Sequence, residues 1–124
     1  MDKLYITGDF VYIHGSLRII NNCDGYYATY YDEEETLQEV NVDVIEGVPI
    51  TSEILENNEW RKTKESFKTQ SYYKKNFGVN VMTIITINGY FRVVYNITHI
   101  RYIQYVHELQ HLLFGLGLNS EMEV

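Results

Sequence analysis

The chain has 124 residues, of which 45% are hydrophobic and 22% charged, a composition that fits one globular domain and excludes a disordered tail. Its net charge of −7 argues against indiscriminate nucleic-acid binding, and no apolar run approaches the roughly 18 residues of a membrane-spanning helix. The single cysteine, Cys23, excludes an internal disulfide, and residues 1–10 lack the basic and apolar regions of a signal peptide, so we expect a cytoplasmic protein.

Residues 1–48 predict a small antiparallel β-meander of four strands. Residues 9–20 have the alternation and central turn of a β-hairpin, and residues 26–31 form a third strand that is rich in aromatic side chains. Residues 36–44 form the fourth strand, in which Gln38-Glu39 shifts the phase of the alternation and indicates a β-bulge. A partly closed SH3-like barrel is one arrangement that hides the edges of such a meander.

The end of this meander is expected at residues 45–50, which include Pro49, the only proline of the chain. We expect one compact unit over 1–124 with two sub-lobes, 1–48 and 49–124. No internal repeat or low-complexity linker separates the two sub-lobes.

A short helix is predicted directly after this boundary, near residues 51–57. Thr51 or Ser52 suits the N-cap position, because a hydroxyl oxygen there accepts a hydrogen bond from a free backbone N–H group. The helix is expected to end at Asn57 or Asn58, since asparagine is a common stop in the left-handed conformation.

The middle of the chain predicts a second β region. Its strongest strand is rich in β-branched residues and leads into Asn88-Gly89, a pair that favours the tight turn of a β-hairpin. The expected strands cover residues 59–62, 71–77, 79–87, 90–95 and 99–103.

The C-terminal segment predicts an amphipathic helix over residues 105–116. Apolar side chains recur there at spacings of three and four residues, and Gly115 and Gly117 end the pattern. The apolar stripe consists of Val106, Leu109, Leu112, Leu113 and Leu116. The predicted fold class is therefore α+β, mainly antiparallel β with a short central helix and a C-terminal helix that packs on a sheet.

The C-terminal helix contains a possible zinc-binding motif. The stretch His107-Glu108-Leu109-Gln110-His111 reads H-E-x-x-H, which on a helix puts two imidazoles on one face and leaves Glu108 as a general base. Catalytic zinc needs a third protein ligand, but only 13 residues follow His111 and none of them is a histidine. A zinc hydrolase that uses His107, Glu108 and His111 is therefore the second alternative, and no cofactor is expected.

Three short stretches carry a resemblance to known proteins. Residues 8–12 (GDFVY), 48–55 (VPITSEIL) and 105–114 (YVHELQHLLF) are similar to segments of small uncharacterised proteins that phages, prophages and mobile elements of Bacteroides and related gut bacteria encode. The resemblance implies a phage-type protein in the cytoplasm of a bacterial host cell, and it implies no particular activity.

The same resemblance bears on the zinc motif. In that group the equivalents of His107, Leu109 and Gln110 recur, whereas the position of His111 is often asparagine. A catalytic ligand would not be replaced so readily. The resemblance therefore implies that His107 and Gln110 hold the helix start against the sheet or contact a partner.

The charge is divided unevenly along the chain. Residues 1–59 hold 13 acidic and two basic residues, a balance of −11, whereas residues 60–124 hold four acidic and eight basic residues, a balance of +4. We expect a non-enzymatic protein–protein interaction module, in one version a host-takeover or anti-defence factor whose carboxylates occupy a basic groove on a host protein. The expected partner-binding residues are Asp32, Glu33, Glu34, Glu35, Glu39, His107 and Gln110.

The first alternative is a single-stranded nucleic-acid-binding protein. Residues 60–92 mix basic side chains, which suit phosphate contacts, with aromatic side chains, which suit base stacking. The acidic half of the chain would repel a nearby phosphate backbone, so this function ranks second. The residues concerned are Trp60, Arg61, Lys62, Lys64, Lys68, Tyr72, Tyr73, Lys74, Lys75 and Arg92.

Overall fold

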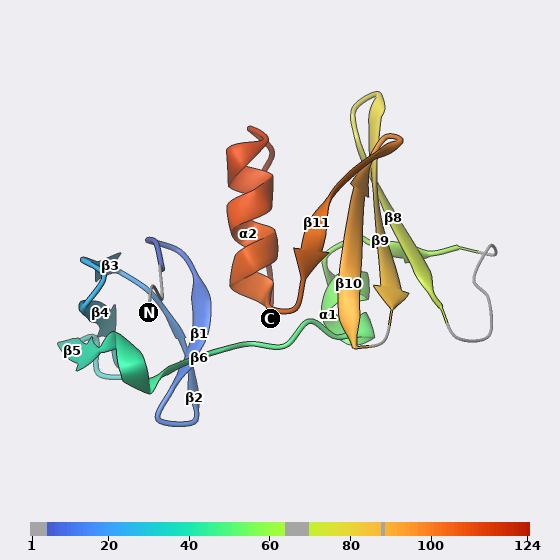
Figure 1. Ribbon diagram of the computed structural model, residues 1–124. Helices are drawn as coiled ribbons and strands as arrows, with labels where there is room; N and C mark the ends of the chain where they lie inside the picture. Colours follow the sequence, from blue (N-terminus) through green and yellow to red (C-terminus); the bar gives the residue numbers. More distant parts are fainter. Residues whose placement is uncertain (1–4, 64–69, 88) are drawn as a thin grey trace.

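The structure is a computed structural model that describes residues 5–63, 70–87 and 89–124. It confirms the α+β fold, mainly antiparallel β with one short central helix and one C-terminal helix. Figure 1 shows a barrel lobe, residues 5–48, on the left and a sheet lobe, residues 49–124, on the right. The C-terminal helix belongs to the sheet lobe and lies on the side of its sheet that faces the barrel lobe. Neither helix of the described residues is long and apolar enough to cross a membrane.

The barrel lobe consists of two three-stranded antiparallel sheets, one with the order β2-β1-β6 and the other with the order β3-β4-β5. The last strand, β6, returns to pair with β1, so β1 has a partner strand on each side. The strands are β1 (Phe10–Ile13), β2 (Ser16–Ile19), β3 (Asn22–Cys23), β4 (Tyr27–Tyr31), β5 (Leu37–Asn41) and β6 (Ile45–Gly47).

The first predicted hairpin is confirmed. Strands β1 and β2 pair in antiparallel register up to Ile13 opposite Ser16. The two turn residues, His14 and Gly15, have positive φ angles of 51° and 79°. Positive φ at both central positions is typical of the type I′ turn, whose twist matches that of the flanking strands.

The predicted fourth strand is wrong in its second half, and it has no bulge. Strands β4 and β5 stay in continuous register through Gln38 and Glu39. Strand β5 ends at Asn41, whose side-chain oxygen accepts a hydrogen bond from the Asp43 N–H and begins a 3₁₀ helix, Val42–Val44. This local hydrogen bond competes with strand pairing, so the chain turns before β6, and the lobe has six short strands where four were predicted.

The sheet lobe contains a five-stranded antiparallel sheet with the order β11-β10-β9-β8-β7. The hairpin predicted at Asn88-Gly89 is confirmed by the pairing of Ile87 with Tyr90, although Asn88 itself lies outside the described residues. The elements are α1 (Ser52–Asn57), β7 (Arg61–Lys62), β8 (Tyr72–Phe77), β9 (Asn80–Ile87), β10 (Tyr90–Tyr95), β11 (Thr98–Ile103) and α2 (Val106–Gly115).

Helix α1 begins and ends as predicted, but the left-handed residue that follows it is not an asparagine. The Thr51 side chain accepts a hydrogen bond from the Ile54 N–H and caps the helix start. The left-handed residue after the helix is Glu59, with φ of 70°, whereas Asn58 has φ of −105°. The buried Asn58 side chain instead donates to the Ile54 carbonyl and exchanges two hydrogen bonds of 2.7 Å with the backbone of Glu123, so it anchors the C-terminal tail.

Each lobe has its own hydrophobic core. In the sheet lobe, the buried residues Leu109 and Leu113 of α2 pack with Ile84 and its neighbours on one face of the sheet. Leu116, the last residue of the predicted apolar stripe, is exposed and lies outside this core. The barrel core is separate and is built around Val11 and residues of β4 and β6.

Backbone contacts hold the end of β6 close to the start of α2. The Val106 N–H donates to the Val48 carbonyl at 2.8 Å, and Pro49 forms an isolated antiparallel bridge with Tyr105. A Cβ atom at Gly47 would lie 2.6 Å from two carbons of the Tyr105 ring. This approach leaves room for glycine alone.

Replacing Gly47 with alanine is therefore expected to lower the free energy of unfolding by about 1–3 kcal/mol, because the added methyl group overpacks the contact between strand and ring. Gly115→Ala is the matched control, since nothing lies within 4 Å of its added Cβ and alanine favours a helix. Urea denaturation of both variants measures the difference. Equal stability of the two variants would contradict the close contact.

Candidate functional site

The start of α2 carries the H-E-x-x-H motif, and its glutamate caps the helix. The Glu108 Oε1 atom accepts hydrogen bonds from the backbone N–H groups of Gln104 and Tyr105 at 2.9 Å and 3.0 Å. A carboxylate at the third helical position satisfies N–H groups that have no partner inside the helix. The guanidinium of Arg101 lies 3.5 Å from the other carboxylate oxygen. Glu108 is thus engaged in holding the helix start.

Gln110 connects α2 to the barrel lobe. Its side-chain carbonyl accepts a hydrogen bond from the Phe10 N–H at 3.0 Å, and its side-chain N–H donates to the Gly8 carbonyl at 2.9 Å. The residue is 6% exposed. A primary amide matches the donor and acceptor of a free backbone segment, so Gln110 pairs with the chain before β1 much as another strand would.

A buried acid completes this connection. The Asp9 carboxylate accepts hydrogen bonds from the Ile6 N–H at 2.9 Å and from Nε2 of His111 at 2.7 Å. Because an ionised carboxylate only accepts, Nε2 carries the hydrogen in this pair. We call Asp9, Gln110 and His111 the lobe joint. Gln110 and His111 of α2 form hydrogen bonds with residues 8–10, at the start of β1 and just before it.

His107 lies one helical turn before His111, stacks on the Tyr105 ring and contacts the tilted ring of Tyr5. Its ring centroid is 5.0 Å from that of Tyr5 and 5.8 Å from that of Tyr105, whose ring is nearly parallel. Burial lowers the pKa of the imidazole, and the neighbouring His111 lowers it further, while Asp9 and Glu108 oppose the change. The Nδ1 atom is buried and has no hydrogen-bond partner among the described residues. His107 is therefore neutral at pH 7.

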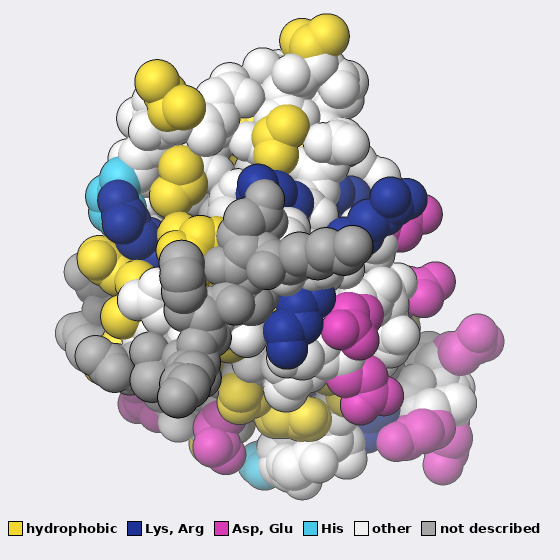
Figure 2. Space-filling view, turned by 90° about the vertical axis from the view of Figure 1, so that its right-hand side faces the viewer, with side chains coloured by type: hydrophobic (Ala, Val, Ile, Leu, Met, Phe, Trp, Pro, Cys, Tyr) yellow, Lys and Arg dark blue, Asp and Glu magenta, His cyan; other side chains and the backbone are white. Residues whose placement is uncertain are grey.

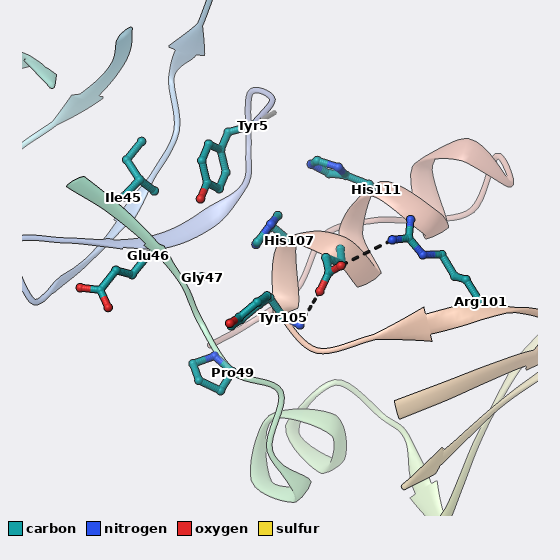
Figure 3. A pocket seen from close by; sticks show the side chains of 10 residues that line it. Tyr5, Ile45, Glu46, Gly47, Pro49, Arg101, Tyr105, His107 and His111 are labelled. Carbon is teal, nitrogen blue, oxygen red and sulfur yellow. Dashed lines mark hydrogen bonds and ion pairs between the residues drawn. The ribbon is translucent and has the colours of Figure 1, made fainter. Parts of the chain in front are cut away.

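His107, Glu108 and His111 line an open cleft of about 680 Å³ between the lobes, seen in Figure 3. Tyr5 lies on the barrel side, whereas His107, His111 and Arg101 lie on the side of the sheet lobe. One polar side chain of its wall, Glu108, is bonded to the Tyr105 N–H and to Arg101. The cleft is thus an open hollow between the lobes whose wall includes the capped start of α2.

The described part of the chain contains no group of side chains that could complete a zinc site at this motif. Among residues 5–63, 70–87 and 89–124, no three His, Cys, Asp or Glu side chains are placed to hold a metal ion. Nε2 of His111 is bonded to Asp9, and the Glu108 carboxylate caps the helix. Each member of the motif has a structural contact, so we do not propose a zinc hydrolase.

An apolar groove borders the lobe joint. Two adjoining hollows of about 780 Å³ and 530 Å³ share Gly8, Phe10 and Ile19 in their walls. One hollow extends to Phe114 near the end of α2, and the other extends to Tyr31 of the barrel lobe. The large apolar side chains exposed along this groove are Ile6, Leu17, Ile19, Tyr31 and Phe114, which expose 37%, 40%, 53%, 56% and 69%.

The acidic residues predicted to bind a partner divide into structural and exposed ones. Asp32 accepts hydrogen bonds from the N–H of Glu34, the N–H of Thr36 and the side chain of Gln38. The hydrogen bonds from Thr36 and Gln38 hold the pKa of this carboxyl below its ordinary value. Glu33 pairs with Arg18 at 2.8 Å. The exposed carboxylates are Glu33, Glu34, Glu35 and Glu39.

The remaining two predicted partner residues, His107 and Gln110, make contacts within the chain. Gln110 uses both ends of its amide within the chain, and the His107 ring stacks on Tyr105 and contacts Tyr5. These contacts agree with the expectation that they hold the helix against a sheet. They leave Gln110 without a free polar atom that faces solvent.

The predicted nucleic-acid face is partly wrong. Trp60 and Tyr73 are 2% and 1% exposed and lie in the sheet-lobe core, so neither can stack on a base. Lys75 donates to the Asn58 carbonyl at 2.9 Å on the same inner side of the sheet. Alternation along β8 explains the error, because every second residue of a half-buried strand faces the core. Lys64 and Lys68 lie outside the described residues, and Arg61, Lys62, Tyr72, Lys74 and Arg92 are exposed or half-buried.

Three important residues are absent from the sequence-based set. Asp9 lies 102 positions from its partner His111, and no local pattern reveals such a pair. Ile19 and Phe114 continue apolar patterns in a strand and a helix, where exposure is not apparent from periodicity. The stretch 8–12, which carries part of the resemblance, was the one available signal for Asp9.

No protein-family model, curated protein or solved structure matches this chain. The resemblance to phage-encoded proteins therefore stays an expectation, and the proposals for function rest on the geometry of the chain.

Replacing Gln110 with alanine is expected to lower the free energy of unfolding by about 2–3 kcal/mol, because it leaves the Phe10 N–H and the Gly8 carbonyl without partners. Gln104→Ala is the matched control, since that residue is exposed just before α2. Urea denaturation measures both effects. A loss that is equally small in both variants would show that the lobe joint contributes little.

The half-buried, neutral His107 predicts a loss of stability in acid. Its folded pKa lies below the ordinary value of 6.5, so the unfolded chain binds a proton more readily and folding weakens as the pH falls through that value. His107→Phe keeps a stacked ring without a titrating group, and it should lose less stability between about pH 7.5 and 5.5 than the wild type does.

Unfolding curves at the two pH values provide the measurement. His14→Asn, in the exposed β1–β2 turn, is the control and should keep the pH dependence of the wild type. The same pH dependence in His107→Phe as in the wild type would contradict the assignment.

Proposed function

We propose that this chain is a non-enzymatic protein-interaction module whose docking surface is the apolar groove beside the lobe joint. The observation that carries the proposal is the alignment of five exposed large apolar side chains along two adjoining hollows. Contiguous exposed apolar surface costs a lone protein free energy and is typical of a binding site.

The groove has the anatomy of a recognition surface. Its walls include the apolar side chains of Ile19 and Phe10, which line both hollows, and the charged side chains of Arg18 and Glu121. Apolar side chains together with polar ones are the usual composition of protein interfaces. The lobe joint lies directly beneath, because Asp9 and Gln110 also line the groove, so the surface is held in shape before a partner arrives.

The acidic charge of the first half of the chain indicates what kind of partner segment would bind. The half of the chain that forms the barrel lobe and α1 has a balance of −11. A partner segment with large apolar side chains flanked by lysine or arginine complements both the groove and this acidic surrounding. In the phage setting that the resemblance implies, the segment belongs to a protein of the host or of the phage, and host takeover or anti-defence is the role we favour.

The groove is a better docking surface than an acidic patch alone. The carboxylates at 32–35 follow β4 in the barrel lobe, whereas Glu53 and Glu56 belong to α1 in the sheet lobe (Figure 1). Because they belong to different lobes, these carboxylates do not form one continuous strip that would fill a basic groove. They contribute long-range attraction, which affects association rates more than it affects affinity.

Two charge-introducing variants test the proposal. Ile19→Asp and Phe114→Asp place a charge in the apolar groove and should reduce capture of the partner at least about tenfold. The matched controls are Val79→Asp and Ile97→Asp, which alter apolar residues that are each 97% exposed in turns of the sheet lobe. All four substitutions are at exposed positions, so thermal unfolding should show that each variant is folded.

The measurement is quantitative mass spectrometry of proteins crosslinked to tagged variants inside the producing cells. The proposal requires proteins that wild type and both controls retain and both groove variants lose. It also requires a photo-crosslinking residue at position 19 to label that protein more than the same residue at position 79. Equal capture by all variants would refute the groove as a docking surface.

A further inference from the structure

The five-stranded sheet has an outer face that the core does not use. In antiparallel pairing, residues directly opposite each other lie on the same face of the sheet. Tyr73 and Ile84 are opposite each other and belong to the core, so their neighbours Tyr72 and Ile85 lie on the outer face. Ile85 belongs to neither core cluster, which agrees with this placement, and it is 8% exposed, so the outer face is covered at this position.

Two rows of side chains cross this outer face. The first row runs over four strands and the second over five, and each joins residues that are directly paired. The first row is Tyr102, Arg92, Ile85 and Tyr72, and the second is His99, Val94, Thr83, Lys74 and Arg61. Register thus collects three basic residues and two tyrosines that are far apart in the sequence.

The face is basic throughout its strands. Residues 72–103, which contain β8 to β11, include no aspartate or glutamate. Figure 2 views the molecule from this side and shows Lys and Arg side chains across the middle of the face, while Asp and Glu side chains gather below and to the right. The net charge of the whole chain therefore does not describe this surface.

The basic character is strongest on the side of β10 and β11. At the opposite edge, Arg61 and Lys74 line a hollow together with Glu56 and Glu59, whose carboxylates partly neutralise them. Arg92 has no acidic neighbour in its row, and its Nε donates to Nδ1 of His99 at 3.0 Å. This hydrogen bond orients the guanidinium beside the His99 ring, which packs 5.2 Å from the ring of Tyr102.

Tyr102 provides a flat aromatic surface beside Arg92. The residue is 52% exposed. An exposed ring beside a guanidinium suits an unpaired base and its phosphate better than it suits a duplex.

We propose that the outer face of the β7–β11 sheet binds single-stranded nucleic acid, with Tyr102 stacking on a base and Arg92 and Arg61 contacting phosphates. Trp60 and Tyr73, which the sequence-based set included, are buried in the core and have no part in this binding face. The face is distinct from the apolar groove, so this inference stands independently of the proposed partner protein.

Fluorescence anisotropy with a labelled single-stranded oligonucleotide of about 20 thymidines, at low salt, tests the proposal. Wild type should bind with a Kd below about 100 μM and should bind a duplex of the same length more weakly. Tyr102→Ala and Arg92→Ala should each weaken single-strand binding at least about fivefold. Tyr102→Phe keeps the ring and should bind like the wild type, which separates stacking from a loss of folding.

Two control variants remove a basic side chain and a tyrosine that lie away from the outer face. Lys62→Ala removes an exposed charge at a position opposite Tyr73, on the other side of the sheet, and Tyr26→Ala removes a tyrosine that is 75% exposed in the barrel lobe. Both should bind within about twofold of the wild type, because neither group lies on the outer face.

Three results would overturn the proposal. The first is no binding below about 100 μM, and the second is duplex binding as tight as single-strand binding, which would indicate charge attraction without stacking. The third is equal weakening in Lys62→Ala and Arg92→Ala. If Tyr102→Ala instead reduced the capture of a partner protein and left the anisotropy unchanged, the face would be a protein contact and the proposal would fail.

Discussion

The buried carboxylate of Asp9 is the constraint on which the arrangement of the two lobes depends. A carboxylate that is 1% exposed is tolerated only when hydrogen bonds and a partner replace the water it has lost. Asp9 obtains one hydrogen bond from Ile6 in its own loop and another from His111 on α2. Because the two donors come from opposite lobes, separating the lobes would leave a buried charge without its partner. Gln110 adds two more hydrogen bonds between α2 and the barrel lobe, to Phe10 and Gly8.

This constraint explains the surfaces that remain available. Helix α2 has its leucines on the sheet and its polar residues on the barrel, so it has little surface free along its middle. The exposed apolar side chains therefore collect where α2 and the barrel meet, at the groove that includes Ile19 and Phe114. The opposite face of the sheet carries basic and aromatic side chains together with the aliphatic Ile85 and Val94. The fold thus separates an apolar groove from a basic face within 124 residues.

Local patterns predicted most of the elements and less of the site. Strand alternation, the His14-Gly15 turn and the spacing of apolar residues in α2 depend on near neighbours, and these elements are confirmed. The predicted bulge failed because β4 determines the register of β5. Trp60 and Tyr73 were assigned to a binding face because composition shows which residues are aromatic and not which face of a strand they occupy. The partner of Asp9 was not predictable, since 102 positions separate the pair.

The sequence by itself determined the α+β class, the hairpins, the two helices and the uneven charge, because each depends on residue type and short spacing. Only the tertiary structure decided what the H-E-x-x-H motif does. Its glutamate caps the helix, His111 satisfies a buried acid and His107 stacks on Tyr105, none of which a five-residue pattern can distinguish from metal ligation. The physical reason is that a polar side chain takes its role from the partner that burial brings to it, and those partners come from distant parts of the chain.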